Sequence, residues 1–424
     1  MADIDSYLRW RGDLDFGERP FNEVDNLICS IVAYIDFAGI VPWEGEEGSV
    51  SVRDACRKIL EASGGDIAPY VKSMANIEAP TLELLSASKR FGQCRLHDLI
   101  DVFRPELSLQ MSGLAIELTP QETYISFRGT DNTLVGWQEN FMLSFQVTEA
   151  QQEAAHYLER AARRAQAEGR RLYVGGHSKG GNLAAYAAAA LPRDLRSTVL
   201  YCWSNDGPGM DRSVVPEGAY DVLGHRFLRI QPQYSVVGMF FDRPEEPRIY
   251  VQSSQTGVLQ HDPTSWETGP GRFAPADDLL PECKVTNSIF ADWIASIPYG
   301  QRKEFTEEFF QVLRAGGAKT LDEVTATPES IQKVLSALGE SSQTTKDAIM
   351  KLVGSTVTNT FSAAREAASR AVETAAANAA RLAGSWSQGR LAEHGVQDGR
   401  ADGDEEGAPE GSPEARDSDA GGED

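Results

Sequence analysis

The segment Gly176-His177-Ser178-Lys179-Gly180 constrains the fold of this chain more than any other feature of its sequence. It directly follows an apolar run at residues 171–174 and directly precedes a stretch of small side chains at residues 182–190. Glycines at both ends of the pattern G-x-S-x-G let the chain bend sharply between a strand and a helix, which raises the serine oxygen above the sheet. The sequence therefore predicts a nucleophilic serine, Ser178, at a strand-to-helix bend.

Apolar runs of strand length alternate with helical stretches on both sides of this bend. The runs occupy residues 114–118, 123–127, 171–174, 198–203, 227–230 and 248–251, and a long helical connection covers residues 136–169. Strands joined by helical connections are typical of a mostly parallel sheet with helices on both faces. The pattern predicts an α/β fold of the α/β-hydrolase type, with helical additions at both ends of the chain.

These additions divide the chain into four predicted regions. Residues 1–110 form a helical cover packed on the core, in which Asn22 or Asp25 caps one helix and Ser51 opens another through a capping box. Residues 111–300 form the α/β-hydrolase core, and residues 301–388 form a C-terminal helical region. The acidic tail, residues 389–424, is too poor in apolar residues to offset the entropy of ordering, and we expect it to be disordered.

The alanine-rich part of the C-terminal region, residues 345–387, carries apolar residues at steps of three and four positions. Such a stripe packs on the protein itself or on a partner helix, and basic residues do not dominate its polar face as they would in a membrane-surface helix. It predicts a protein partner or self-association.

Charge and cysteine content limit the partners and the compartment. The net charge of -23 opposes binding to nucleic acid or to anionic membrane surfaces, although part of it belongs to the acidic tail. The five cysteines show no C-x-x-C pair, the N-terminus lacks a secretory signal, and no apolar run reaches the roughly 18 residues of a membrane span. We expect a cytoplasmic protein without a transmembrane segment, a disulfide framework or a zinc site.

His261 is the predicted base for Ser178. The order along the chain in this fold is serine, acid, histidine, and His261 lies in a loop after the last predicted strand. The other histidines are less suitable. Two of them precede the serine, His97 and His156, and His177 adjoins it. His225 begins a strand, and His394 lies in the tail.

Two backbone amides are predicted to bind the oxyanion. The amide of Lys179 follows the nucleophile at a helix N-terminus, and Thr130 lies in the loop after the strand at residues 123–127, where a second donor is expected. The alternative for this loop is a plain turn in which Asp131 caps a helix.

The segment Phe127-Arg128-Gly129-Thr130, the nearby Trp137 and the bend at Ser178 resemble the class 3 (fungal-type) lipases over residues 114–266. Three further segments, at residues 21–25, 206–209 and 260–263, resemble a bacterial family of lipase-like α/β-hydrolases of uncharacterised substrate. The resemblance implies the fold and an acyl-transfer reaction and leaves the substrate open.

The chain departs from the lipase pattern at two positions. Lys179 replaces the usual leucine after the nucleophile, which predicts a more polar entrance to the acyl pocket. Ser235 stands where the resembling lipases carry the catalytic aspartate. Asp206, which follows the strand at residues 198–203 on the same sheet edge as Ser178, is the predicted replacement. Three alternatives remain: Asp206 only caps a turn, Asp211 or Asp242 is the acid, or the site is a dyad that uses Ser235.

These features predict a serine hydrolase that cleaves a small-molecule or lipid ester through an acyl-enzyme. No ligand cluster or phosphate-binding glycine motif accompanies the serine, so no metal or organic cofactor is expected. The alternatives are a non-catalytic relative that binds a partner, motivated by the missing acid, and a thioesterase or peptidase on the same scaffold.

Overall fold

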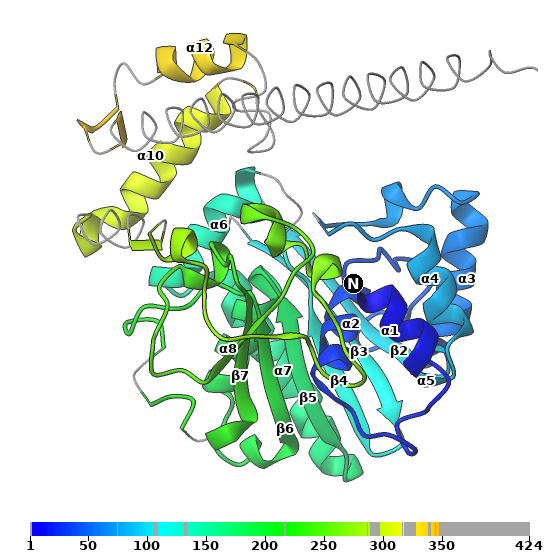
Figure 1. Cartoon of the computed structure of the whole chain (residues 1–424). Helices are drawn as coiled ribbons and strands as arrows, with labels where there is room; N and C mark the ends of the chain where they lie inside the picture. Colours follow the sequence, from blue (N-terminus) through cyan, green and yellow to red (C-terminus); the bar gives the residue numbers. More distant parts are fainter. Residues whose placement is uncertain are drawn as a thin grey trace, which may run out of the picture. The chain divides into compact units, whose positions relative to one another are not determined.

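A computed structural model gives the three-dimensional structure of the chain (Figure 1). It describes residues 2–346 except 74, 105–108, 131–133, 216–217, 222, 286, 289–296, 316, 318–327, 338–340 and 344. The described residues belong to one unit, Met1–Gly354. The predicted alanine-rich helix lies almost entirely outside them, and the predicted acidic tail lies wholly outside them.

Nine strands of the described part of the chain form a single sheet, in the order in which they occur in the sequence. The strands are β1 (Val50–Ser51), β2 (Arg95–Arg104), β3 (Leu109–Thr119), β4 (Glu122–Phe127), β5 (Arg171–His177), β6 (Val199–Asn205), β7 (Phe227–Pro232), β8 (Arg248–Val251) and β9 (Pro275–Ala276). Strands β4 to β8 are parallel, whereas β1 to β4 pair antiparallel and β9 pairs antiparallel with β8. The predicted α/β class is confirmed, with a parallel centre and antiparallel edges.

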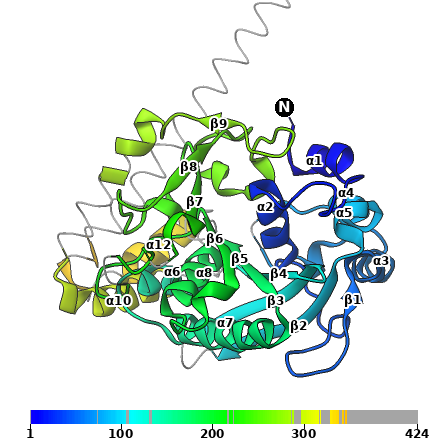
Figure 2. The same ribbon diagram turned by 90° about the horizontal axis from the view of Figure 1, so that it is seen from below.

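Helices cover both faces of this sheet (Figure 2). They are α1 (Ile4–Arg11), α2 (Glu23–Val32), α3 (Val52–Ser63), α4 (Ala79–Ala87), α5 (Lys89–Gly92), α6 (Leu134–Phe145), α7 (Glu149–Glu168), α8 (Lys179–Ala190), α10 (Arg302–Ala315) and α12 (Pro328–Ala337). One hydrophobic core contains α1 to α4 and the other contains α7 and α8. Successive side chains of a strand point to opposite faces, so Tyr124 of β4 enters the first core and Ile125 enters the second.

Helix α2 begins where the sequence predicts, because Asn22 and Asp25 form a capping box. The Asn22 side chain accepts from the amides of Val24 and Asp25, and the Asp25 carboxylate accepts from the amide of Asn22. Arg90, which is buried, forms an ion pair with Asp25. The N-terminus of this helix is thereby fixed to α5, which matters because the chain beyond its other end reaches the candidate site.

Strand β2 lies within the region that the sequence predicts to be helical. Its pairing with β3 shifts in register between His97 and Ile100, and Asp98 adopts a positive φ of 51°. A β-bulge of this kind breaks the alternation of apolar and polar residues by which a strand is recognised. The N-terminal cover is therefore helical only to Gly92, and β2 extends the sheet.

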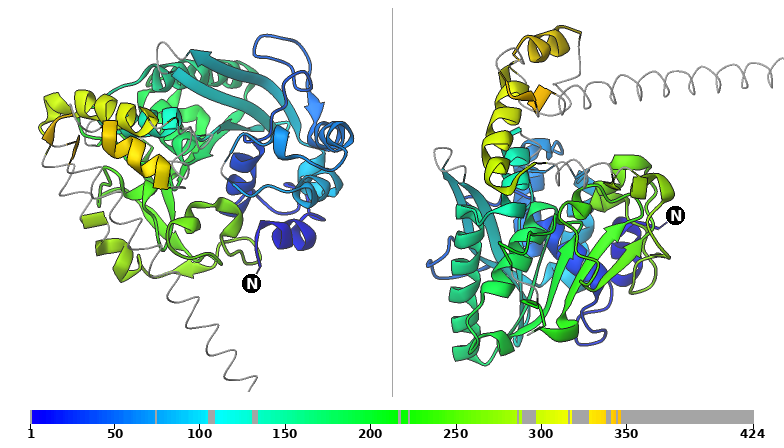
Figure 3. Two further views of the ribbon diagram at one scale, coloured as in Figure 1. Left: turned by 90° about the horizontal axis from the view of Figure 1, so that it is seen from above. Right: turned by 90° about the vertical axis from the view of Figure 1, so that its left-hand side faces the viewer.

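Helices α10 and α12 lie within residues 301–388, the region that the sequence predicts to be helical. Helix α10 lies beside α6 (Figure 3). The two helices contact each other through aromatic rings, with the centroids of Phe141 and Phe310 5.7 Å apart. Across the described ranges, no helix combines the length and the hydropathy needed to cross a membrane.

Candidate active site

Ser178 occupies a strained bend between β5 and α8. Its φ of 58° and ψ of -129° lie in a region that residues with side chains rarely adopt. The flanking glycines are required by close approach: a Cβ at Gly176 would lie 2.4 Å from the Gly180 carbonyl carbon, and one at Gly180 would lie 2.1 Å from the Phe127 carbonyl oxygen. The predicted bend is therefore present, with the serine at its apex.

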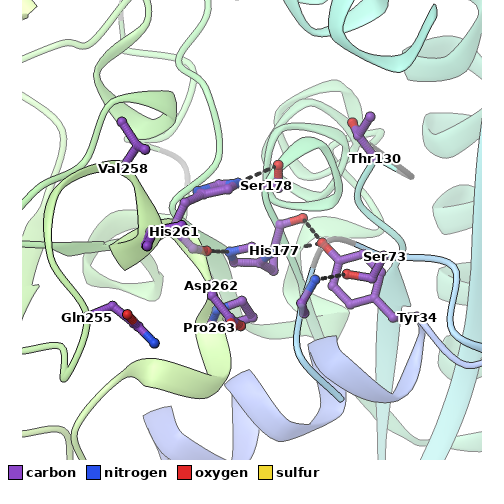
Figure 4. A pocket seen from close by; sticks show the side chains of 12 residues that line it. Tyr34, Ser73, Thr130, His177, Ser178, Gln255, Val258, His261, Asp262 and Pro263 are labelled. Atoms are coloured by element: carbon purple, nitrogen blue, oxygen red, sulfur yellow. Dashed lines mark hydrogen bonds between the residues drawn. The ribbon is translucent and has the colours of Figure 1, made fainter. Parts of the chain in front are cut away.

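Ser178 and His261 lie within hydrogen-bond distance of each other. The Ser178 Oγ is 3.0 Å from His261 Nε2, and Figure 4 shows the two side chains facing each other. His261 ends a short 3₁₀ turn, Gly257–His261, that follows β8. The sheet places two residues that are 83 positions apart in the sequence at the same edge.

Asp206 contacts the other side of the His261 ring. Its Oδ2 lies 2.6 Å from His261 Nδ1, and its side chain is fully buried. Asp206 follows β6 with a positive φ of 47°, and its amide donates to the Ile230 carbonyl oxygen at 2.7 Å. A carboxylate at this position holds Nδ1 protonated, so that Nε2 can accept the serine proton.

Ser235, the residue at the expected position of the acid, lies on the same carboxylate. Its hydroxyl donates a hydrogen bond to Asp206 Oδ1, while Asp206 Oδ2 contacts His261. Gly238 leaves room for this pair, since a Cβ there would lie 2.4 Å from Asp206 Oδ1 and 2.6 Å from Ser235 Oγ. The two oxygens of Asp206 thus have different partners, and Ser235 contributes to the site by orienting the carboxylate.

The two other candidate acids contact arginines. Asp211 lies 3.5 Å from Arg302, and Asp242 lies 2.6 Å from Arg248. Among the described hydrogen bonds of His261, the carboxylate partner is Asp206. The geometry therefore separates Asp206 from the alternatives that the sequence left open.

His177 contacts the backbone of the loop that carries His261. Its Nε2 lies 2.9 Å from the His261 carbonyl oxygen, which can only accept, so Nε2 carries the proton. Nδ1 then accepts from the Tyr34 hydroxyl at 2.9 Å. Burial, and secondarily the proximity of His261, lower the pKa of His177 well below its usual value, while burial raises the pKa of Tyr34. Both side chains stay neutral, and they connect the chain beyond α2 to the base.

The two predicted oxyanion residues both lie near Ser178: Thr130 lines the same pocket, and Lys179 is the next residue in the chain. Thr130 follows β4, lines the same pocket as Ser178, and donates from its hydroxyl to Asn140 Oδ1 of α6 at 3.0 Å. Lys179 is the first residue of α8, where backbone amides have no acceptor within the helix. Both positions are compatible with amides that donate to an oxyanion.

The side chain of Lys179 does not make the pocket entrance polar, contrary to the expectation from sequence. It is buried, and its Nζ lies 2.7 Å from Glu139 Oε2 of α6 and 2.8 Å from the Gln110 carbonyl oxygen. A buried ammonium needs a counter-charge and hydrogen-bond acceptors, and this environment supplies both. Lys179 therefore ties the bend to α6 and β3.

Several residues of this site have no signal in the sequence. Tyr34, Glu139 and Gly238 act through contacts with residues far away in the chain, and a single sequence gives no distances. For metals, no group of three or more His, Cys, Asp or Glu side chains able to hold an ion occurs among the residues that the structure describes.

The family of this chain follows from the segment that contains the site. No curated protein matches the chain. Among solved structures, the crystal structure of M37 lipase is similar at 15% identity and a TM-score of 0.33, over 52% of this chain and 69% of the lipase chain. The Mbeg1-like family model matches residues 85–311, which is more than half of the chain and includes Ser178, Asp206 and His261. The chain therefore belongs to the Mbeg1-like family.

Proposed function

We propose that this protein is a serine hydrolase that cleaves carboxylic esters through an acyl-enzyme, with Ser178 as nucleophile, His261 as base and Asp206 as acid. The observation that carries the proposal is the continuous contact from Ser178 Oγ through the His261 ring to Asp206, at 3.0 Å and 2.6 Å. Nucleophile, base and orienting carboxylate in hydrogen-bond reach form the arrangement that acyl transfer requires.

The reaction follows from these contacts. His261 Nε2 removes the Ser178 proton, the serine oxygen attacks the ester carbonyl, and the amides of Lys179 and Thr130 donate to the oxyanion. The imidazolium, stabilised by Asp206, then protonates the departing alcohol. A water molecule, deprotonated by His261, attacks the acyl-enzyme and releases the acid.

The non-catalytic alternative was based on the missing acid at position 235. The buried carboxylate of Asp206 contacts His261 in its place, so this reason no longer holds. We expect the protein to act in the cytoplasm, because all five of its cysteines are free thiols and buried. The predicted partner helix lies outside the described residues and stays a prediction.

A fluorophosphonate probe tests the proposed function. We expect the wild-type protein to be labelled and Ser178→Ala to remain unlabelled, because the probe reacts with an activated serine. The measurement is probe fluorescence after gel electrophoresis, with Ser213→Ala as a control for an exposed serine outside the site. Equal labelling of wild type and Ser178→Ala, or no labelling of either, would contradict the proposal.

A further inference from the structure

The pocket beside Ser178 has a limited volume. Its size is about 160 Å³, and its described lining includes Thr130, Ser178, His261 and Val258 (Figure 4). An enclosed apolar cavity of about 150 Å³ holds benzene, so the part of a substrate that this open pocket encloses is roughly six non-hydrogen atoms. A butyryl group fits such a space, whereas a decanoyl group has about twice as many atoms.

The rim of the pocket is apolar. Val258 and Leu259, on the 3₁₀ turn that ends at His261, are 63% and 61% exposed and line the pocket together with Ala75 and Pro263. Burial of apolar groups of the substrate against such side chains improves binding by roughly four-fold for each methylene group. An acyl group longer than the pocket has to displace lining side chains or leave part of its chain exposed to water, which opposes productive binding at Ser178.

The described lining contains a carboxylate and neither lysine nor arginine. The carboxylate is that of Asp262, which accepts from the amide and hydroxyl of Thr264 at 3.0 Å and 2.8 Å. A phosphate or carboxylate group of a substrate would therefore meet a negative charge in this pocket.

Three cations lie within two positions of a lining residue in the sequence, and all three are paired. Lys72, next to Ser73, lies 3.6 Å from Asp36. Arg128, two positions before Thr130, lies 3.0 Å from Asp101, and Lys179 lies 2.7 Å from Glu139. Recognition of an anionic group normally uses such a cation, commonly an arginine in a forked contact. The net charge of -23 adds a long-range repulsion of anions.

We propose that the substrates of this site are neutral esters with a short acyl group, and that the site discriminates against acyl-CoA and phosphate-bearing lipid esters. This inference rests on the proposed function. It follows from the volume of the pocket, its apolar rim at Val258 and Leu259, and the acidic character of its described lining.

A series of p-nitrophenyl esters of increasing acyl length tests the proposed limit on the size of the acyl group. We expect kcat/KM of the full-length protein to rise from p-nitrophenyl acetate to the butyrate and to fall at least ten-fold from the butyrate to the decanoate. Ser178→Ala should turn over none of them. A wild type that is most active on the decanoate would overturn the inference and leave the proposed function standing. Absence of both turnover and fluorophosphonate labelling would overturn both.

A pair of thioesters, one neutral and one anionic, tests the proposed discrimination against anionic substrates. We expect butyryl N-acetylcysteamine, a neutral truncated analogue, to have at least a ten-fold higher kcat/KM than butyryl-CoA. Val258→Lys places a cation at the rim and should narrow this ratio at least five-fold relative to Val258→Met, which has a similar length and no charge. An equal preference for both thioesters in the wild type, or a ratio that is the same in the two variants, would overturn the charge argument.

Discussion

Replacing Asp206 by asparagine is expected to reduce kcat about 10⁴-fold while leaving the protein folded. Asparagine has nearly the same shape, so the hydrogen bond from Ser235 and the packing against Gly238 can persist. The amide cannot, however, hold His261 Nδ1 protonated through a negative charge or stabilise the imidazolium. Steady-state kinetics on p-nitrophenyl butyrate, together with far-UV circular dichroism, measure both parts of this prediction.

Asp211→Asn is the matched control for this variant. Asp211 lies in the same segment after β6, and its contacts are with Ser213 and Arg302 instead of His261. We expect Asp211→Asn to keep kcat within about two-fold of the wild type, because a partly exposed ion pair contributes little. If Asp206→Asn stayed within ten-fold of the wild type, the acid would have to be sought elsewhere, with Asp242 and Ser235 as the remaining candidates.

The second large effect concerns stability: Glu139→Gln should lower the free energy of unfolding by about 3–5 kcal/mol. The side chains of Lys179 and Glu139 are 1% and 2% exposed, so removal of one charge leaves the other buried without compensation. Replacement of both by apolar residues, Lys179→Met with Glu139→Leu, should recover most of this loss. Urea unfolding followed by circular dichroism measures the three proteins under one set of conditions.

An exposed ion pair provides the comparison. Arg163 lies 2.6 Å from Glu159 one turn earlier in α7, with exposed fractions of 57% and 33%. Glu159→Gln should therefore cost less than about 1 kcal/mol. If Glu139→Gln were no more costly than Glu159→Gln, the buried pair would not hold the bend to α6 in the way we describe.

The sequence predicts the centre of the fold well because its signals there are local. Each strand from β3 to β8 contains a short apolar run, and the bend at Ser178 depends on two glycines within the same five residues. Strand β2 escapes prediction because the bulge at Asp98 disturbs its periodicity. The fold class therefore follows from pattern, while the antiparallel edge does not.

The candidate site is only partly predictable for a related reason. Order along the chain singles out His261, and strand ends bring Asp206 into consideration. The burial of the Lys179 side chain depends on Glu139, 40 residues away, and the support of His261 depends on a contact between Tyr34 and His177, 143 residues apart. Such long-range contacts carry no periodic signal, so a single sequence cannot indicate them.

Intact-protein mass spectrometry of the acid-quenched reaction tests the central claim most directly. Within one turnover of p-nitrophenyl butyrate, we expect the protein to gain the mass of one butyryl group, and peptide mapping to place it on Ser178. Ser178→Ala should gain no mass. Turnover of the ester without an acylated protein, or a butyryl group on a different residue of an active enzyme, would contradict the assignment of Ser178 as nucleophile.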